Sequence, residues 1–456
     1  MSRARKRYPS GSSGPLRADV LRVLGVLKVA TPDQIQRLTL PHLTYRYTEL
    51  PESQRKSARN KAHRAAALDL AKHGQTTEAG FSSGGEKLWR LTPLGLEAAS
   101  RELDRPMDEM GGTARGAGTT GAAHAMAVNE TIAAFVQPKP SLAELAREPE
   151  DAVAAAQAAP GGIGSITSWS TEVALPPSGT WSSPGKGGAQ ADAVLAAPEH
   201  DVPLLFVEVD NGWMDPKLIA EKFAKYARFF HRSVKDTDGT QRPMWATRWA
   251  ASGREGLPPV ALVFTGRGPK SLYQRMTAVK NLSTPYWAGR WGFERAYVDY
   301  DGRIPVLATT LERLQTNGPQ GQTWWRYGRD SWQPLTEALD NPDGQNIYQA
   351  RRRATWEEDR RQEEEQRRRN EAERQRREEK ARARAELEWD REQEEVAREP
   401  DPSCQLCRGA LEGDMRPGFD LDPDDAPPED GLHCPGCRIQ LAEPKTRFGR
   451  LLRRFG

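Results

Sequence analysis

The chain has 456 residues, of which 28% are charged and only 37% are hydrophobic. This length predicts roughly two to four domains, and the low apolar content indicates that part of the chain has no core of its own. No apolar run reaches the roughly 18 residues that a membrane-spanning helix needs, so we expect a cytoplasmic protein without a membrane partner.

Charge is unevenly distributed along the chain, although the net charge is only +3. Residues 1–104 contain 18 lysines and arginines against 10 acidic residues, a local excess of +8. A basic region of this kind favours a polyanionic partner.

Residues 17–104 are predicted to form a DNA-binding domain behind a flexible basic arm, residues 1–16. Two short helices, the second capped by Thr31, are followed by a basic helix over residues 53–74. Two strands around a Ser/Gly turn come next, and a further helix begins at Thr92. This order of elements is typical of a winged helix-turn-helix.

The basic helix supplies the predicted DNA contacts. An α-helix fits the major groove of double-stranded DNA, and its cations neutralise phosphates. The alternative is a solvated helix face in a protein–protein module. The candidate DNA-binding residues are Arg55, Lys56, Arg59, Asn60, His63 and Arg64.

A Gly-rich linker over residues 105–121 leads into a predicted core over residues 122–315. The pattern of this core is a helix, three strands, a helix and a further strand, which predicts a mixed sheet flanked by helices. Asp192 lies inside the second strand, and the third strand ends with Glu208 and Asp210.

Asp192 and Glu208 have the separation of two adjacent strands joined by a short turn. If these strands pair, the two carboxylates can converge on an oxygen-lined site for Mg²⁺ or Mn²⁺. Such a metal supports phosphodiester cleavage, and Lys222 or Lys225 of the following helix could stabilise charge on the phosphate. The alternative is a structural ion-pair network at the end of the sheet.

Several stretches resemble the actinobacterial replication-relaxation family of plasmids and integrative elements. They are LWRLTPLGLEAA, the HAMAVNE helix, the ADAVL strand and FVEVDNG followed by KFAKY. The resemblance covers roughly residues 17–315. It implies a role in plasmid replication or DNA relaxation, a core similar to the PD-(D/E)xK nucleases, and other replication or conjugation proteins of the element as partners.

In that nuclease superfamily, an acid on the second strand is followed by Glu-x-Lys on the third, with a further Glu on the first core helix. By this resemblance Asp192, Glu208 and Glu130 match the three acids. Asp210 stands where the lysine is expected, and Lys222 would replace that lysine from the following helix.

Three functions follow from these residues. The first is metal-dependent nicking or cleavage of DNA. The second is a non-catalytic DNA-binding initiator or transcriptional regulator that retains a degenerate nuclease scaffold. The third is a covalent relaxase that uses Tyr226.

The C-terminal part changes composition twice. After an irregular connection over residues 316–346, residues 347–399 are rich in Arg and Glu without a heptad seam and predict a single charged helix. Residues 400–442 contain all four cysteines as two C-x-x-C pairs, which is typical of a structural Zn²⁺ site, with a redox dithiol as the alternative; residues 443–456 form a basic tail. The predicted zinc ligands are Cys404, Cys407, Cys434 and Cys437.

The sequence therefore predicts a multidomain α+β protein. Its parts are an N-terminal winged helix-turn-helix, a central mixed α/β restriction-endonuclease-like core, a long charged α-helix and a C-terminal zinc ribbon.

Overall fold

The protein is a mixed α+β chain. The computed structural model describes residues 8–107, 109–110, 122–236, 238–251, 253–291, 297–398, 404–405, 431–434 and 437–438. The chain divides into two compact units, residues 1–351 and 352–456. None of the helices in the described ranges combines the length and the apolar character that crossing a bilayer requires.

The first unit begins with five helices and a small antiparallel sheet of order β1-β3-β2. The strands are β1 (Val29–Ala30), β2 (Thr76–Phe81) and β3 (Lys87–Leu91). The helices are α1 (Gly14–Leu27), α2 (Pro32–Thr39), α3 (Glu52–Arg59), α4 (Lys61–Lys72) and α5 (Pro93–Leu103). The predicted starts are confirmed, because Thr31 caps α2 in a capping box with Gln34, and Thr92 caps α5.

The basic segment, expected as one helix over residues 53–74, is broken in two. Asn60 separates α3 from α4 and is only 4% exposed. Its side-chain amide donates to Asp33 of α2 at 3.4 Å. Asn often interrupts helices because its short side chain offers the backbone competing hydrogen bonds. The basic segment therefore forms two shorter helices in place of one continuous helix.

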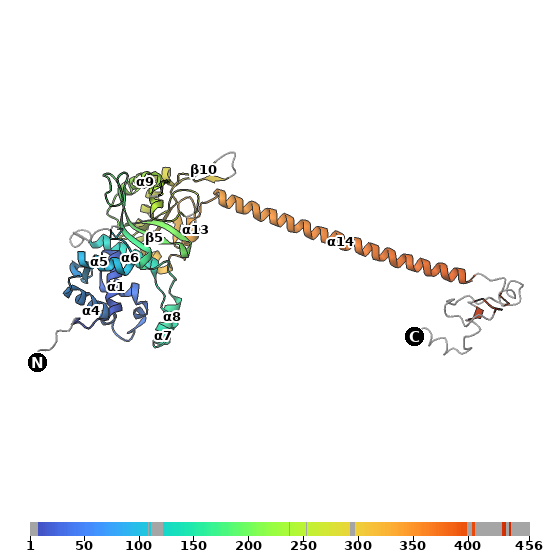
Figure 1. Cartoon of the computed structure of the whole chain (residues 1–456), viewed down its shortest axis with the longest axis horizontal. Helices are drawn as coiled ribbons and strands as arrows, with labels where there is room; N and C mark the ends of the chain where they lie inside the picture. The colour runs from blue at the N-terminus through green and yellow to red at the C-terminus, as the bar shows by residue number, and fades with distance from the viewer. Residues whose placement is uncertain are drawn as a thin grey trace. The chain divides into compact units, whose positions relative to one another are not determined.

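A seven-stranded mixed sheet of order β14-β13-β12-β9-β6-β5-β4 forms the centre of the first unit (Figure 1). β6 pairs antiparallel with β5 and parallel with β9, and β9 pairs parallel with β12. The strands are β4 (Trp169–Leu175), β5 (Ala189–Ala197), β6 (Val202–Asp210), β9 (Val260–Phe264), β12 (Val306–Thr310), β13 (Trp324–Arg326) and β14 (Trp332–Gln333).

Helices cover both faces of this sheet. α6 (Ala122–Val136) packs with the β6 side chains Val207 and Val209, whereas α9 (Pro216–His231) and α10 (Pro269–Leu282) pack with Phe206 on the opposite face. Figure 1 shows α6 and α9 on the two sides of β5. Since both faces are buried, β6 is almost continuously apolar, and its two acids come only at its end.

The core on the α6 side continues into the N-terminal helices. Val20, Leu24 and Leu27 of α1 belong to the same buried cluster as Ile132 of α6 and Val207 of β6. Helix α1, helix α6 and the sheet therefore share one hydrophobic core.

Residues 316–346, expected to be an irregular connection, contribute β13, β14 and α13 (Leu335–Leu339) to the first unit. Trp324 is completely buried, and its indole N–H donates to the carbonyl of Pro319 at 3.1 Å. Strands of two or three residues carry no readable period, which explains why the sequence did not reveal them.

Two smaller features complete the described part of the first unit after β9. Helix α12 (Leu311–Asn317) directly follows β12. β11 (Val298–Asp299) pairs antiparallel with β10 (Arg290–Trp291) outside the main sheet.

The remaining long element is α14 (Gln345–Arg398), which confirms the predicted charged helix. Exposed (i, i+4) ion pairs lie along it, among them Glu365–Arg369 at 2.6 Å and Glu373–Arg377 at 2.7 Å. Trp356 and Trp389 are each 61% exposed, so the helix buries little apolar surface. Ion pairs of this kind contribute about 0.2 to 0.5 kcal/mol each and together favour an isolated helix.

Candidate functional site

Two acids lie opposite each other at one end of the main sheet. β5 and β6 are antiparallel, with Ala193 opposite Val207, so the adjacent residues Asp192 and Glu208 face each other across the strands. The predicted pairing of these two strands is present. Opposite residues on antiparallel strands have Cβ atoms roughly 4.5 to 5.5 Å apart, which brings the two carboxylates into one neighbourhood.

Helix α9 supplies the partners of Glu208. The Lys222 ammonium donates to Oε2 of Glu208 at 2.5 Å, and the Tyr226 hydroxyl donates to Oε1 at 2.5 Å. Lys222 and Tyr226 are one helical turn apart, so both reach the end of β6 from one face of α9. The cationic partner that a buried carboxylate requires is therefore Lys222.

Helix α6 supplies a partner of Asp192. Nε2 of His124 lies 3.1 Å from Oδ1 of Asp192, and the backbone N–H of Val209 donates to Oδ2 at 2.7 Å. His124 was not among the predicted site residues. The signal for it was weak, since it is one polar residue in the HAMAVNE stretch and a lone histidine has many roles in proteins.

The pKa values of the two acids are shifted in opposite directions. Burial and the negative charge of Asp192 raise the pKa of Glu208 to about 8, although Lys222 and Tyr226 act against this rise. Burial alone would also raise the pKa of Asp192, but the hydrogen bond from His124, together with Lys222 and the Val209 N–H, lowers it. The hydrogen bond to Asp192 raises the pKa of His124. Asp192 is thus the more acidic of the two groups, and burial favours the protonated form of Glu208.

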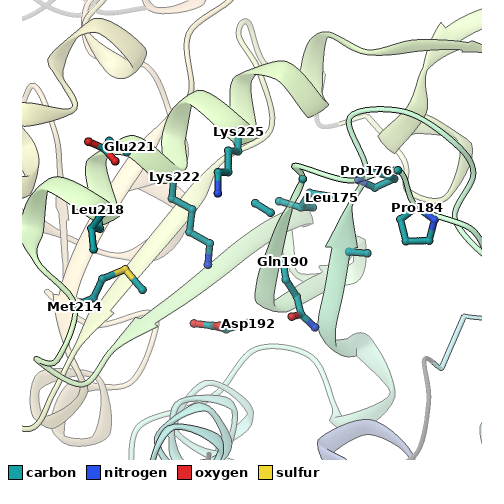
Figure 2. Close-up of a pocket in the computed structure, with 14 residues that line it drawn as sticks. Leu175, Pro176, Pro184, Gln190, Asp192, Met214, Leu218, Glu221, Lys222 and Lys225 are labelled. Carbon is teal, nitrogen blue, oxygen red and sulfur yellow. The ribbon is translucent and has the colours of Figure 1, made fainter.

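A cleft of about 750 Å³ opens beside this cluster. Figure 2 shows Asp192 and Gln190 of β5 projecting toward it, with Lys222 and Lys225 entering from α9. Leu175 at the end of β4 contributes apolar surface to another part of the wall. The cleft therefore combines the carboxylates of Asp192 and Glu221, two ammonium groups and apolar surface.

Asp210 and Glu130, two of the predicted catalytic acids, do not join the cluster. Asp210 forms a buried ion pair with Arg275 of α10, with one guanidinium contact at 3.1 Å. Glu130 accepts from Arg37 at 2.5 Å and from Gln34 at 3.0 Å, both on α2. Each acid is held by an arginine of a neighbouring helix, and this keeps it away from Asp192.

Tyr226, the candidate nucleophile of a covalent relaxase, is 1% exposed. Burial and the charges of Glu208 and Asp192 raise its pKa well above the usual value. A hydroxyl that is buried and bound to a carboxylate is a structural donor to Glu208, which disfavours attack by Tyr226 on a phosphate.

The predicted DNA-binding residues divide into exposed and buried groups. Arg64 of α4 is exposed, and Lys56 of α3 is half-buried and pairs with Glu86 at 2.7 Å. His63 is fully buried, and its Nε2 lies 3.1 Å from the hydroxyl of Thr39. Its side chain is therefore not at the surface.

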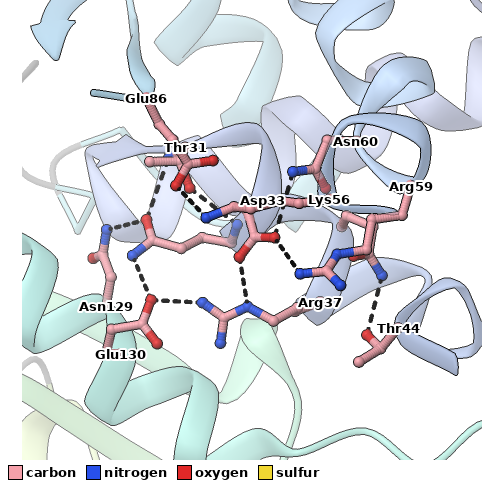
Figure 3. Close-up of polar contacts among 12 residues, drawn as sticks. Thr31, Asp33, Arg37, Thr44, Lys56, Arg59, Asn60, Glu86, Asn129 and Glu130 are labelled. Atoms are coloured by element: carbon pink, nitrogen blue, oxygen red, sulfur yellow. Dashed lines mark hydrogen bonds and ion pairs between the residues drawn. The ribbon is translucent and has the colours of Figure 1, made fainter. Parts of the chain in front are cut away.

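Arg59 and Asn60 belong to a polar network beneath the exposed side of the basic helices α3 and α4 (Figure 3). Both contact Oδ1 of Asp33, at 3.2 Å and 3.4 Å, while Oδ2 of Asp33 accepts from Arg37. Arg37 also binds Glu130 of α6. The network thus connects the basic helices to the helix that carries His124.

The remaining predicted DNA-binding residue, Arg55 of α3, is half-buried. It donates to the carbonyl of Thr48 at 2.8 Å and so secures the loop that precedes α3.

In the second unit, Cys404, Cys434 and Cys437 place their Sγ atoms within 4.8 Å of one another. The backbone N–H of Gln405 donates to Leu432 at 2.8 Å and brings the two cysteine segments together. Three converging thiols suit a metal ion such as Zn²⁺. The fourth predicted ligand, Cys407, lies outside the described residues.

The fold and the site therefore define a mixed α/β unit with an acidic–basic cluster at one end of its sheet. A family model described as replication-relaxation matches residues 21–242 and supports the resemblance over that range. A comparison with curated proteins found no match, and a comparison with solved structures found none either.

Proposed function

We propose that the protein binds double-stranded DNA of a mobile genetic element and nicks it in a metal-dependent step during replication or relaxation. The observation that carries this proposal is the convergence of Asp192, Glu208 and Lys222 at one end of the sheet, beside an open cleft. The replication-relaxation match supports the setting, since it spans β5, β6 and α9.

The order of elements supports a nuclease-like core. α6, β4, β5, β6, α9 and β9 follow the helix–three strands–helix–strand pattern expected of PD-(D/E)xK proteins. Lys222 donates to Glu208, which agrees with a lysine relocated from the strand to the following helix. Its ammonium is suited to stabilise negative charge on a phosphate in the cleft.

The donor set at this site fits Mg²⁺ or Mn²⁺. Asp192 and Glu208 supply carboxylate oxygens, the ligands that these ions prefer. When bound, the ion would polarise the phosphate and lower the pKa of a water molecule. Because the pKa of Glu208 is raised, a metal ion would compete with a proton for this carboxylate, and binding should be tighter at higher pH.

The N-terminal helices are proposed to choose the DNA site. A three-stranded sheet of order β1-β3-β2, in which β2 and β3 follow α4 and pair with β1 from between α1 and α2, supports a winged helix-turn-helix. Two cations of the basic helices would contact phosphates: Arg64, which is exposed, and Lys56, which is half-buried. Arg59, Asn60 and His63 would act beneath them by holding α3 and α4 in position.

A non-catalytic DNA-binding scaffold is the second candidate function. All four oxygens of Asp192 and Glu208 already accept a hydrogen bond or lie within hydrogen-bond distance of a protein group. Within the described part of the chain, His124, Asp192 and Glu208 do not bring three ligand atoms within 4.8 Å of one another. Both observations favour a structural network.

Purified protein, supercoiled plasmid and Mg²⁺ or Mn²⁺ separate the two candidates. We expect the wild-type chain to produce open circles, and Asp192→Asn or Glu208→Gln to abolish them. Glu130→Gln is the matched control, because this acid lies outside the cluster, and it should retain nicking. Tight plasmid binding without open circles under either metal would favour the scaffold.

A further inference from the structure

The loop before α9 and the first turn of α9 present three large apolar side chains, two of which line the cleft. Trp213 is 87% exposed, and Met214 and Leu218 are 45% and 53% exposed. Met214 and Leu218 also line the cleft that contains Asp192 and Lys222, as Figure 2 shows. Neighbouring exposed apolar residues of this size mark an interaction site.

The backbone around Trp213 is held on both sides, so its exposure does not come from a loose loop. Gly212 has a φ of +84°, and its N–H donates to Asp210 at 3.1 Å. Its carbonyl accepts from Arg267 at 3.1 Å. A Cβ at Gly212 would meet Arg267 at 2.6 Å, so only glycine fits there. On the other side of Trp213, Asp215 caps α9.

Trp213 immediately precedes Met214 and so lies at the edge of the cleft, whose other lining residues suit one strand of DNA. Lys222 and Lys225 project into the cleft and can bind phosphates, and Leu175 adds apolar wall (Figure 2). In an intact duplex the faces of the bases are stacked on one another. An exposed indole can therefore contact a base face only where that base has left the stack.

We propose that Trp213 stacks on an unstacked base of the strand in the cleft. The cleft then prefers single-stranded or locally melted DNA to an intact duplex. This inference rests on the proposed function for DNA as the ligand, and it adds the conformation of the strand and the residue that selects it.

The test uses a short single-stranded oligonucleotide that carries 2-aminopurine, the full chain and no divalent metal, so that no strand is cut. Stacking on an indole quenches 2-aminopurine. We expect quenching with the wild-type protein, partial quenching with Trp213→Phe, and none with Trp213→Ala. The alanine variant should also bind the oligonucleotide roughly 5- to 100-fold more weakly, as expected for the loss of one base–aromatic stack.

Trp356→Ala is the matched control, because Trp356 is 61% exposed but belongs to the second unit, whereas Trp213 precedes the cleft-lining residue Met214 in the first. It should bind and quench like the wild type. Unchanged quenching and affinity in Trp213→Ala would overturn the proposal. An equal loss of affinity for the single strand and for intact duplex would also overturn it, because it would show a contact that is indifferent to stacking.

Plasmid nicking by the same variants separates this inference from the proposed function. Quenching by a wild-type chain that does not nick would remove the catalytic proposal and support the role of Trp213. Nicking without any quenching would leave the catalytic proposal and remove the role of Trp213. A wild-type chain that binds the oligonucleotide without quenching assigns the apolar patch to another occupant, such as a protein.

Discussion

The Lys222 ammonium lies 2.5 Å from Oε2 of Glu208, at the point where β6 ends beside α9. The acid is 8% exposed, so its charge depends on this partner and on the neighbouring Asp192. A buried acid with a raised pKa makes the stability of the fold depend on pH.

Glu208→Gln should make the chain less sensitive to pH. The pKa of Glu208 is about 8 in the folded chain, above its usual 4.5. Between these two pH values the folded chain keeps a proton on Glu208 that the unfolded chain has lost. The stabilisation of the folded chain by this proton is therefore complete below pH 4.5 and is lost as pH rises through about 8. We expect the wild type to lose stability relative to Glu208→Gln on the order of a few kcal/mol over this range. Urea unfolding at several pH values measures it, and parallel curves would contradict the assignment.

Arg275→Ala should strongly destabilise the first unit. It leaves Asp210 buried without its partner, at a cost of about 3 to 5 kcal/mol. The double variant with Asp210→Asn should recover much of this loss, because no unpaired charge remains. Thermal unfolding measures both. Arg377→Ala on exposed α14 is the control, with an expected cost below about 1 kcal/mol. Equal costs for Arg275→Ala and Arg377→Ala would contradict the buried ion pair.

Arg64→Ala and Arg59→Ala should have different effects on duplex binding. Arg64 is exposed, so its loss should lower the slope of log K against log salt by about 0.9 for one phosphate contact. The Arg59 side chain is 12% exposed and pairs with Asp33, so its loss should lower the melting temperature and leave the slope nearly unchanged. Fluorescence anisotropy at several salt concentrations checks this. The reverse pattern would show that Arg59 reaches the DNA.

The cysteine cluster should hold a single structural zinc ion. Purified protein is expected to contain zinc by mass spectrometry of the metal. Cys404→Ser or Cys437→Ser should lose it, because each substitution removes one of the four predicted thiolates and leaves the tetrahedral site open. His433→Ala is the control and should retain zinc. A metal content unchanged by the serine substitutions would contradict a thiolate site, and a chain without zinc would favour a redox dithiol.

The sheet end was predictable because apolar strands have a strong pattern. Asp192 and Glu208 are charged residues in two such strands. The short turn between the strands predicts that they pair antiparallel. The apolar pattern also placed Lys222 on the helix that follows β6. The charged helix and the cysteine pairs were also predictable from the sequence, since each depends on the local spacing of residues.

The partners of the acids were not predictable, because they come from distant segments. Asp210 and Glu208 both end one apolar strand, and the sequence indicated Lys222 near the site but did not reveal that Asp210 pairs with Arg275. His124 meets Asp192 across 68 positions of the chain. Such contacts depend on the packing of helices against the sheet, which local periodicity does not encode.

The central claim is that Asp192 and Glu208 hold a divalent ion beside Lys222. A titration of the zinc-loaded chain with Mn²⁺ at pH 8.5 tests it most directly. Electron paramagnetic resonance measures the Mn²⁺ that remains free. We predict one bound Mn²⁺ per chain, lost in Asp192→Asn and in Glu208→Gln and retained in Glu130→Gln. Absence of Mn²⁺ uptake by the wild type, or equal uptake by all four proteins, would contradict the account.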